Sequence, residues 1–119
     1  ARDLALLARE LLTAHPETLT YTSTVKKDFR DGKLVMYNHD RLLTKFEGCD
    51  GLKTGYFTKA GYSIVSTAMR DNKRVITVIL GAAKNSSGGH PSLARDKKAA
   101  ELMEKGLNIL SMSGSASVY

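Results

Sequence analysis

The sequence predicts an α+β domain in which helices pack against an antiparallel sheet. Apolar residues recur at helical spacing near both ends of the chain, over residues 2–14 and 93–110. Between them lie β-prone runs joined by short turns, and short turns connect antiparallel rather than parallel neighbours. With 119 residues, of which 42% are hydrophobic and 25% charged, the chain has the length and composition of one globular domain.

The first predicted element is an amphipathic helix over residues 2–14. Its apolar face is formed by Leu4, Leu7, Ala8 and Leu11. The helix should end at His15-Pro16, because the residue before a proline disfavours helical backbone. Only Ala1 precedes it, and alanine cannot cap the free N–H groups of a helix start. We therefore expect the chain to begin inside a longer protein.

A β-hairpin is predicted next. Residues 19–29 are rich in β-prone side chains, Asp31-Gly32 is a hairpin turn signal, and residues 33–37 supply the return strand. The following segment, residues 38–50, is polar and indicates a connection. It leads into a further strand over residues 51–58.

Two more strands and a closing helix complete the prediction. Residues 62–69 and 74–80 are β-prone on either side of a turn, and the second run is apolar on both faces, so we expect it to be central and buried. A glycine-rich loop over residues 81–91 precedes the helix at 93–110. The apolar stripe of that helix consists of Leu93, Ala100, Met103, Leu107 and Leu110. The domain should span residues 1–110, and the small, polar residues 111–119 should fray or form a linker.

Charge and composition exclude several function classes. Eighteen Lys and Arg against twelve Asp and Glu give a net charge of +6, but the charges are scattered and no nucleic-acid-binding motif accompanies them. We therefore expect no nucleic-acid partner. The three histidines have no metal-binding spacing, so neither a metal nor another cofactor is expected. Cys49 is the single cysteine and matches no cysteine-enzyme signature, which predicts a packed thiol.

The strongest motif is Lys53-Thr54-Gly55, the third motif of serine acyl-transfer enzymes. A tripeptide alone is weak evidence for a protein family, but the residues on both sides of it lengthen the match. They are Asp50-Gly51-Leu52 before the motif, Ala60-Gly61-Tyr62 after it, Ala68-Met69-Arg70-Asp71, Arg74-Val75-Ile76 and Leu80-Gly81-Ala82. These flanks resemble the sequences of the serine D-alanyl-D-alanine carboxypeptidases, which are low-molecular-mass penicillin-binding proteins. The segments 1–9, 15–17 and 38–43 are also similar to that family. The resemblance covers residues 1–110 and implies part of a β-lactamase/transpeptidase-like fold.

The resemblance also implies roles for individual residues. Lys53 corresponds to a catalytic lysine that orients a serine of the Ser-x-Asn motif and favours an anionic substrate, and the Thr54 hydroxyl can bond the terminal carboxylate of D-alanine. Gly55 allows the substrate backbone to approach the strand edge. The backbone N–H of Tyr56 corresponds to an oxyanion-hole donor. Arg95 is the best positional match to a carboxylate-binding arginine, which suits the bidentate geometry of a guanidinium.

The family's two earlier motifs, Ser-x-x-Lys and Ser-x-Asn, should lie upstream of Ala1. Ser23-Thr24-Val25-Lys26 does spell Ser-x-x-Lys. In the predicted hairpin, however, the side chains of Ser23 and Lys26 face opposite sides of a strand, and no Ser-x-Asn follows before Lys53. We therefore reject this string as the nucleophile.

Two functions from different classes follow from the sequence. If the family resemblance holds, the intact protein removes the terminal D-alanine from peptidoglycan pentapeptide stems through an acyl-enzyme and binds β-lactams, in the periplasm or elsewhere outside the cytoplasmic membrane. A membrane anchor beyond this chain stays possible. The alternative is a non-catalytic fragment that binds an anionic polymer or a protein partner through its basic surface. An uncovered sheet edge would favour self-association or domain swapping.

Overall fold

The computed structural model describes residues 1–113 and 117–118. The elements in chain order are α1 (Arg2–Ala14), α2 (Thr18–Thr22), β1 (Lys26–Phe29), β2 (Leu34–Tyr37), α3 (Leu42–Lys45), β3 (Cys49–Phe57), β4 (Gly61–Arg70), β5 (Lys73–Ala82), α4 (Leu93–Ser113) and β6 (Ser117–Val118). Strands β1 and β2 form a separate hairpin, and the main sheet has the order β3-β4-β5-β6. The predicted α+β class is confirmed.

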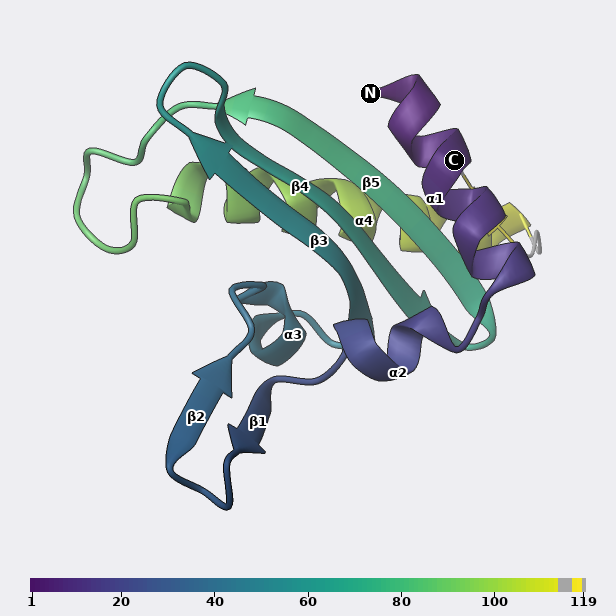
Figure 1. The fold of residues 1–119 in the computed structure, drawn as a ribbon. Helices are drawn as coiled ribbons and strands as arrows, with labels where there is room; N and C mark the ends of the chain where they lie inside the picture. The colour runs from purple at the N-terminus through teal and green to yellow at the C-terminus, as the bar shows by residue number, and fades with distance from the viewer. Residues whose placement is uncertain (114–116, 119) are drawn as a thin grey trace.

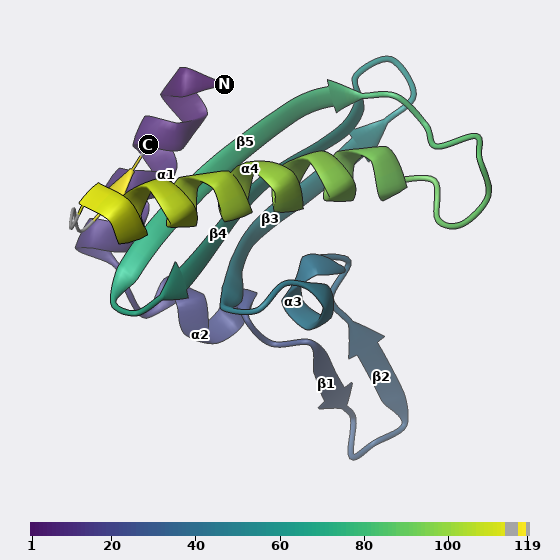
Figure 2. The same ribbon diagram turned by 180° about the vertical axis from the view of Figure 1, so that it is seen from behind.

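The main sheet lies between two helices. Helix α4 runs along one face of the sheet, and α1 packs on the other face against β5 (Figures 1 and 2). The β1–β2 hairpin projects away from the sheet and is joined to it through α2 and α3 (Figure 1). This arrangement leaves the outer edge of β3 uncovered along the side that faces the loop before α4.

Strands β3, β4 and β5 are antiparallel neighbours, with one register shift between Cys49 and Gly51 and another between Tyr62 and Ile64. Lys53 pairs with Val65, and Tyr56 pairs with Tyr62. The tight turn between β4 and β5 has Asp71 and Asn72 at φ values of 51° and 63°, which is the left-handed backbone that a two-residue hairpin turn requires. The turn predicted at 70–73 is therefore confirmed.

The core lies between α4 and the sheet. It comprises Leu42, Phe46, Ile64, Ala68, Val75, Ala99, Met103 and Leu107. Helix α4 comes close to β5 because Gly106 has no side chain: a Cβ there would lie 2.6 Å from Cγ2 of Val75. Met103 and Leu107 of the predicted stripe are buried, and Ala99, which we did not predict, joins them.

Three local predictions are wrong in part. Thr18–Thr22 forms a short helix rather than the start of a strand, and it is anchored by the Thr22 hydroxyl, which donates to the Asp50 carbonyl oxygen at 2.7 Å. Helix α3 stands inside the segment predicted as a plain connection. Strand β5 is not central: β4 lies on one side of it, and on the other side only the two residues of β6 pair with it.

The end of the chain departs from the predicted tail. Helix α4 continues three residues beyond Leu110 to Ser113, and β6 pairs in parallel with Arg74 and Val75 of β5. The remaining tail residues, 114–116 and 119, lie outside the described residues. Among the helices that the structure describes, none is long and apolar enough to cross a membrane.

Candidate functional site

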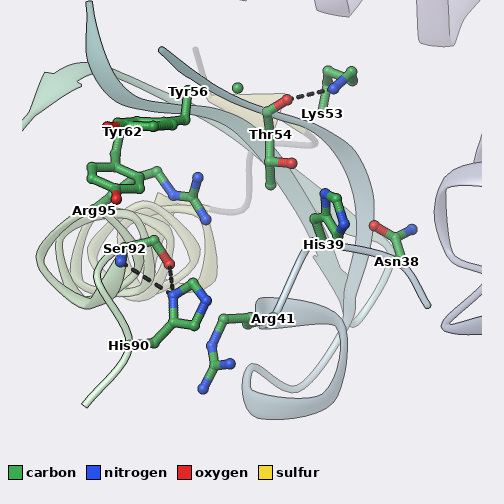
Figure 3. Close-up of a pocket in the computed structure, with 11 residues that line it drawn as sticks. Asn38, His39, Arg41, Lys53, Thr54, Tyr56, Tyr62, His90, Ser92 and Arg95 are labelled. Atoms are coloured by element: carbon green, nitrogen blue, oxygen red, sulfur yellow. Dashed lines mark hydrogen bonds between the residues drawn. The ribbon is translucent and has the colours of Figure 1, made fainter. Parts of the chain in front are cut away.

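A groove of about 680 Å³ runs beside the outer edge of β3. Three segments line it: the strands β3 and β4, the turn after the β1–β2 hairpin, and the start of α4 with the loop before it. The lining residues are Asn38, His39, Arg41, Lys53, Thr54, Gly55, Tyr56, Tyr62, His90, Ser92 and Arg95 (Figure 3). All five residues that the sequence suggested for substrate binding are among them.

The Lys53-Thr54-Gly55 motif lies on an edge strand. Within the described sheet, β3 pairs with β4 alone, so its other edge has free backbone groups that an extended peptide can bond. Gly55 has no atom within 4 Å of where a Cβ would stand, which leaves open space beside the strand. Lys53 is exposed, and its ammonium group donates to the carbonyl oxygen of Thr54.

Two tyrosines close one end of the groove. The rings of Tyr56 and Tyr62 stack with their centroids 4.2 Å apart, because the two residues are directly opposed on β3 and β4 (Figure 3). Both phenol rings lie on the same side of the sheet as Arg95. The stack presents an aromatic surface at this end of the groove.

Arg95 lies in the first turn of α4 and is only 4% exposed. Its Nε donates to Oδ1 of Asp96 at 2.9 Å, and Nη1 donates to the Ser63 carbonyl oxygen at 3.3 Å. Asp96 in turn accepts a hydrogen bond of 3.1 Å from the Ser92 hydroxyl. No sequence pattern predicts these partners, because an acidic residue that becomes buried in a charged helix turn has the same spacing as an exposed one.

Several groove residues were not predicted. Asn38 was noted only for its similarity to the family, and Arg41 was not singled out. His39 and His90 are exposed, as expected of surface histidines, but both line the groove. The groove lining thus carries Lys53, Arg41 and Arg95 and no acidic side chain. That charge suits an anionic ligand.

A buried carboxyl group lies beneath the groove. Asp40 is 5% exposed; its Oδ1 accepts the Leu42 N–H at 3.1 Å, and its Oδ2 has no hydrogen-bond partner. Burial is the main reason that the pKa of Asp40 is raised to about 6, and the charge of Asp96 raises it further.

Two other sequence candidates lie away from the groove. Ser23 caps the end of α2 and Lys26 begins β1, and neither lines the groove. The strand expected around Ser23 is absent, so the argument from strand geometry against this pair is wrong. The absence of a Ser-x-Asn before Lys53 and the position of both residues outside the groove still argue against it. Burial raises the pKa of the Cys49 thiol to about 12, which makes it a poor nucleophile. Over residues 1–113 and 117–118, no cluster of His, Cys, Asp and Glu could hold a metal ion.

Comparison with known proteins identifies the family. The family model for D-alanyl-D-alanine carboxypeptidases, peptidase family S11, matches residues 1–84. The chain belongs to this family. It is 38% identical over 87 residues to the D-alanyl-D-alanine carboxypeptidase DacF of Bacillus subtilis, covering 70% of this chain and 22% of that relative. It is 40% identical over 83 residues to DacC of Escherichia coli, covering 69% of this chain and 20% of that relative.

Solved structures of penicillin-binding proteins share the fold. Penicillin-binding protein 5 from Haemophilus influenzae superposes with a TM-score of 0.76 at 28% identity, over 91% of this chain and 29% of its own. Penicillin-binding protein D2 from Listeria monocytogenes, in its cefotaxime-bound form, gives 0.68 at 35% identity, over 85% of this chain and 38% of its own. The chain thus has part of the β-lactamase/transpeptidase fold. It spans about a fifth of the length of the curated carboxypeptidases DacF and DacC.

Proposed function

We propose that this chain is the Lys-Thr-Gly part of a serine D-alanyl-D-alanine carboxypeptidase. The intact enzyme would remove the terminal D-alanine from peptidoglycan pentapeptide stems through an acyl-enzyme, and β-lactams would acylate the same serine. The observation that carries the proposal is the groove that places Lys53, Thr54 and Arg95 along one free strand edge.

The groove supplies what a peptide ending in a carboxylate needs. An extended peptide can add to β3 as a further strand, with its backbone close to Gly55. Its terminal carboxylate would then meet the Thr54 hydroxyl and the Arg95 guanidinium, which offer one neutral and one charge-assisted hydrogen bond. The stacked tyrosines offer an aromatic surface at one end of the groove, against which an apolar part of the peptide can pack.

The remaining catalytic groups would come from the nucleophile-bearing part of the intact enzyme. A serine of Ser-x-x-Lys would attack the peptide carbonyl, and Lys53 would orient the serine of Ser-x-Asn across the groove. The backbone N–H of Tyr56 would stabilise the tetrahedral oxyanion together with the N–H of the nucleophile. Such an enzyme acts where peptidoglycan lies, in the cell envelope outside the cytoplasmic membrane.

Ligand binding by the chain itself tests the proposal. We expect N-acetyl-D-alanyl-D-alanine to shift the backbone amide NMR signals of residues 53–56, and the L,L dipeptide to shift them less, because one fixed strand edge orients only one stereoisomer's methyl groups. Thr54→Val removes the hydroxyl while keeping the shape and should weaken binding several-fold. Exposed Thr44 provides the matched Thr44→Val control. Shifts confined to the far face of the sheet, or equal for the two stereoisomers, would contradict the proposed function.

A further inference from the structure

The Arg95 side chain combines burial with access to the groove. It is 4% exposed, yet its guanidinium points into the groove between the tyrosine pair and Ser92 (Figure 3). A guanidinium carries five N–H donors, and a buried one is costly unless those donors have partners. The donors that the protein itself occupies therefore decide which ones a ligand can use.

Asp96 occupies one edge of the guanidinium. Nε of Arg95 donates to Oδ1 of Asp96 at 2.9 Å, and Nη2 lies 2.9 Å from the same oxygen. Nη1 donates to the Ser63 carbonyl oxygen at 3.3 Å. These contacts use three of the five donors and leave one N–H on each terminal nitrogen. Two such N–H groups form the parallel fork that binds a carboxylate through both of its oxygens.

Asp96 is itself fixed. It is 6% exposed, its backbone N–H donates to the Ser92 carbonyl oxygen at 3.0 Å, and its Oδ2 accepts the Ser92 hydroxyl at 3.1 Å. Nε of Arg41 lies 3.9 Å from Oδ2. The first turn of a helix also favours a negative side chain. Asp96 therefore cannot turn away from Arg95 without losing several contacts.

Ser92 supports Asp96 rather than acting as a nucleophile. Its hydroxyl lies 2.7 Å from Nδ1 of His90, a contact that resembles an activated serine. However, Ser92 is only 2% exposed and its oxygen lies between His90 and Asp96, whereas a catalytic triad places the histidine between serine and carboxylate. The hydroxyl is thus part of the support for Asp96.

We propose that Asp96 is a positioning residue that holds Arg95 by its Nε edge and so presents the opposite, end-on edge to the substrate's terminal carboxylate. The inference rests on the proposed function, because it assumes that Arg95 binds that carboxylate. It adds a residue that sequence motifs do not point to. It also explains why a groove that favours anions has a carboxylate directly beneath its arginine.

A purely electrostatic role for Asp96 predicts the opposite change in anion binding, so the direction of the change distinguishes the two roles. Asp96 is a negative charge in contact with Arg95, so removing it should strengthen the binding of any anion if charge alone mattered. If Asp96 instead positions Arg95, its removal frees the guanidinium to rotate, and carboxylate binding should weaken.

The experiment compares two ligands by NMR titration of the full chain: N-acetyl-D-alanyl-D-alanine and its C-terminal amide, which lacks the carboxylate. We expect the wild-type chain to prefer the carboxylate. Asp96→Ala should reduce that preference about tenfold, as loss of an oriented charge-assisted bond implies. Asp96→Asn should stay within about threefold of wild type, because its amide oxygen still accepts the Arg95 Nε–H. The control Glu101→Ala removes the same charge from an exposed site on α4 and should leave the preference unchanged.

A second readout needs no ligand. The Arg95 Nε–H signal should exchange slowly with solvent in the wild-type chain and in Asp96→Asn, and fast in Asp96→Ala. This measurement also covers the case in which Asp96→Ala fails to fold, because fast exchange of the Arg95 Nε–H in the wild-type chain would contradict the fixed contact that the proposal requires.

The outcomes separate the two proposals. A wild-type chain that does not distinguish the acid from the amide would contradict the carboxylate site itself, and the role of Asp96 with it. A selective wild type whose Asp96→Ala variant keeps or improves its preference would leave the proposed function intact and overturn the role of Asp96.

Discussion

Arg74 on β5 forms a two-pronged ion pair with Asp50 on β3: Nη1 and Nη2 lie 2.8 Å from Oδ1 and Oδ2. The same Nη1 donates to the Thr67 hydroxyl on β4 at 2.9 Å, so one side chain ties together three strands. Asp50 stands three residues before Lys53. The pair therefore fixes the start of the strand that carries the Lys-Thr-Gly motif.

Arg74→Lys should lower the free energy of unfolding by about 1–2 kcal/mol, because an ammonium group cannot bond both carboxylate oxygens in this geometry. Urea denaturation measures the change. Arg2→Lys at the exposed start of α1 is the control and should change stability by less than about 0.5 kcal/mol. An equally small effect of Arg74→Lys would show that the pair does not hold β3.

Asp40→Asn should stabilise the protein at neutral pH. The pKa of this buried carboxyl rises from 3.8 to about 6 on folding, so the folded state favours the protonated form. Stability from this group is therefore fully present below pH 3.8 and is lost as pH rises through 6. The neutral amide of the Asp40→Asn variant avoids that loss and should raise the free energy of unfolding by about 2 kcal/mol at pH 7.5. This is less than the free energy that corresponds to the full pKa shift, because solvent screens part of the charge.

Thermal unfolding of the wild type and of Asp40→Asn between pH 4 and 8 measures the stabilisation by the neutral amide. The difference in melting temperature should be largest above pH 7 and should shrink toward pH 4. Asp28→Asn on the exposed strand β1 is the matched control and should show no such trend. A constant difference across the range would mean that Asp40 is ionised throughout in the folded state.

Gly106→Ala should destabilise the domain despite the higher helix propensity of alanine. The new Cβ would lie 2.6 Å from Cγ2 of Val75, and valine is stiff and cannot move that methyl group away cheaply. Overpacking should exceed the propensity gain and cost about 1–3 kcal/mol. Val75→Ala in the same chain should recover part of the loss, which a double-mutant cycle by urea denaturation would detect. Additive effects would contradict the close contact.

The chain alone should form no stable adduct with benzylpenicillin. The single Ser-x-x-Lys string, Ser23 to Lys26, does not line the groove, and Ser92, which does line it, is only 2% exposed. Intact mass after incubation measures the outcome on the wild type and on Ser23→Ala. An adduct that disappears in Ser23→Ala would show that the rejected string is a nucleophile after all.

Local sequence patterns predicted the fold class, the first and last helices and the β3–β5 strands. These elements bury particular faces against the rest of the domain, and that burial sets the spacing of their apolar residues. They failed at Thr18–Thr22, whose β-prone residues form a helix that is anchored by the Thr22 hydroxyl on Asp50. They also placed β5 at the centre of the sheet. An apolar run reports burial of both faces, which α1 and α4 provide here, and says nothing about how many strands lie beside it.

Only the site residues that have a counterpart in the family's sequence pattern were predicted. Lys53, Thr54, Gly55, Tyr56 and Arg95 were named from their similarity to the family, and they do meet in one groove. Asp96 and Asp40 were not found as site residues, because burial decides their importance: Asp96 is a buried partner of Arg95 and Ser92, and Asp40 is buried beside α4, which lies more than 50 residues further along the chain. No spacing rule connects such positions.

D-alanine release by a chimera tests the central claim most directly. Residues 1–113 would replace the corresponding segment of the Escherichia coli carboxypeptidase DacC, to which the chain is 40% identical over 83 residues. We expect the folded chimera to release D-alanine from a pentapeptide. Lys53→Ala should lower kcat/KM by about 100-fold or more, whereas Lys45→Ala at an exposed position outside the groove should leave it unchanged. A chimera that folds but releases no D-alanine, or that is indifferent to Lys53→Ala, would contradict the account.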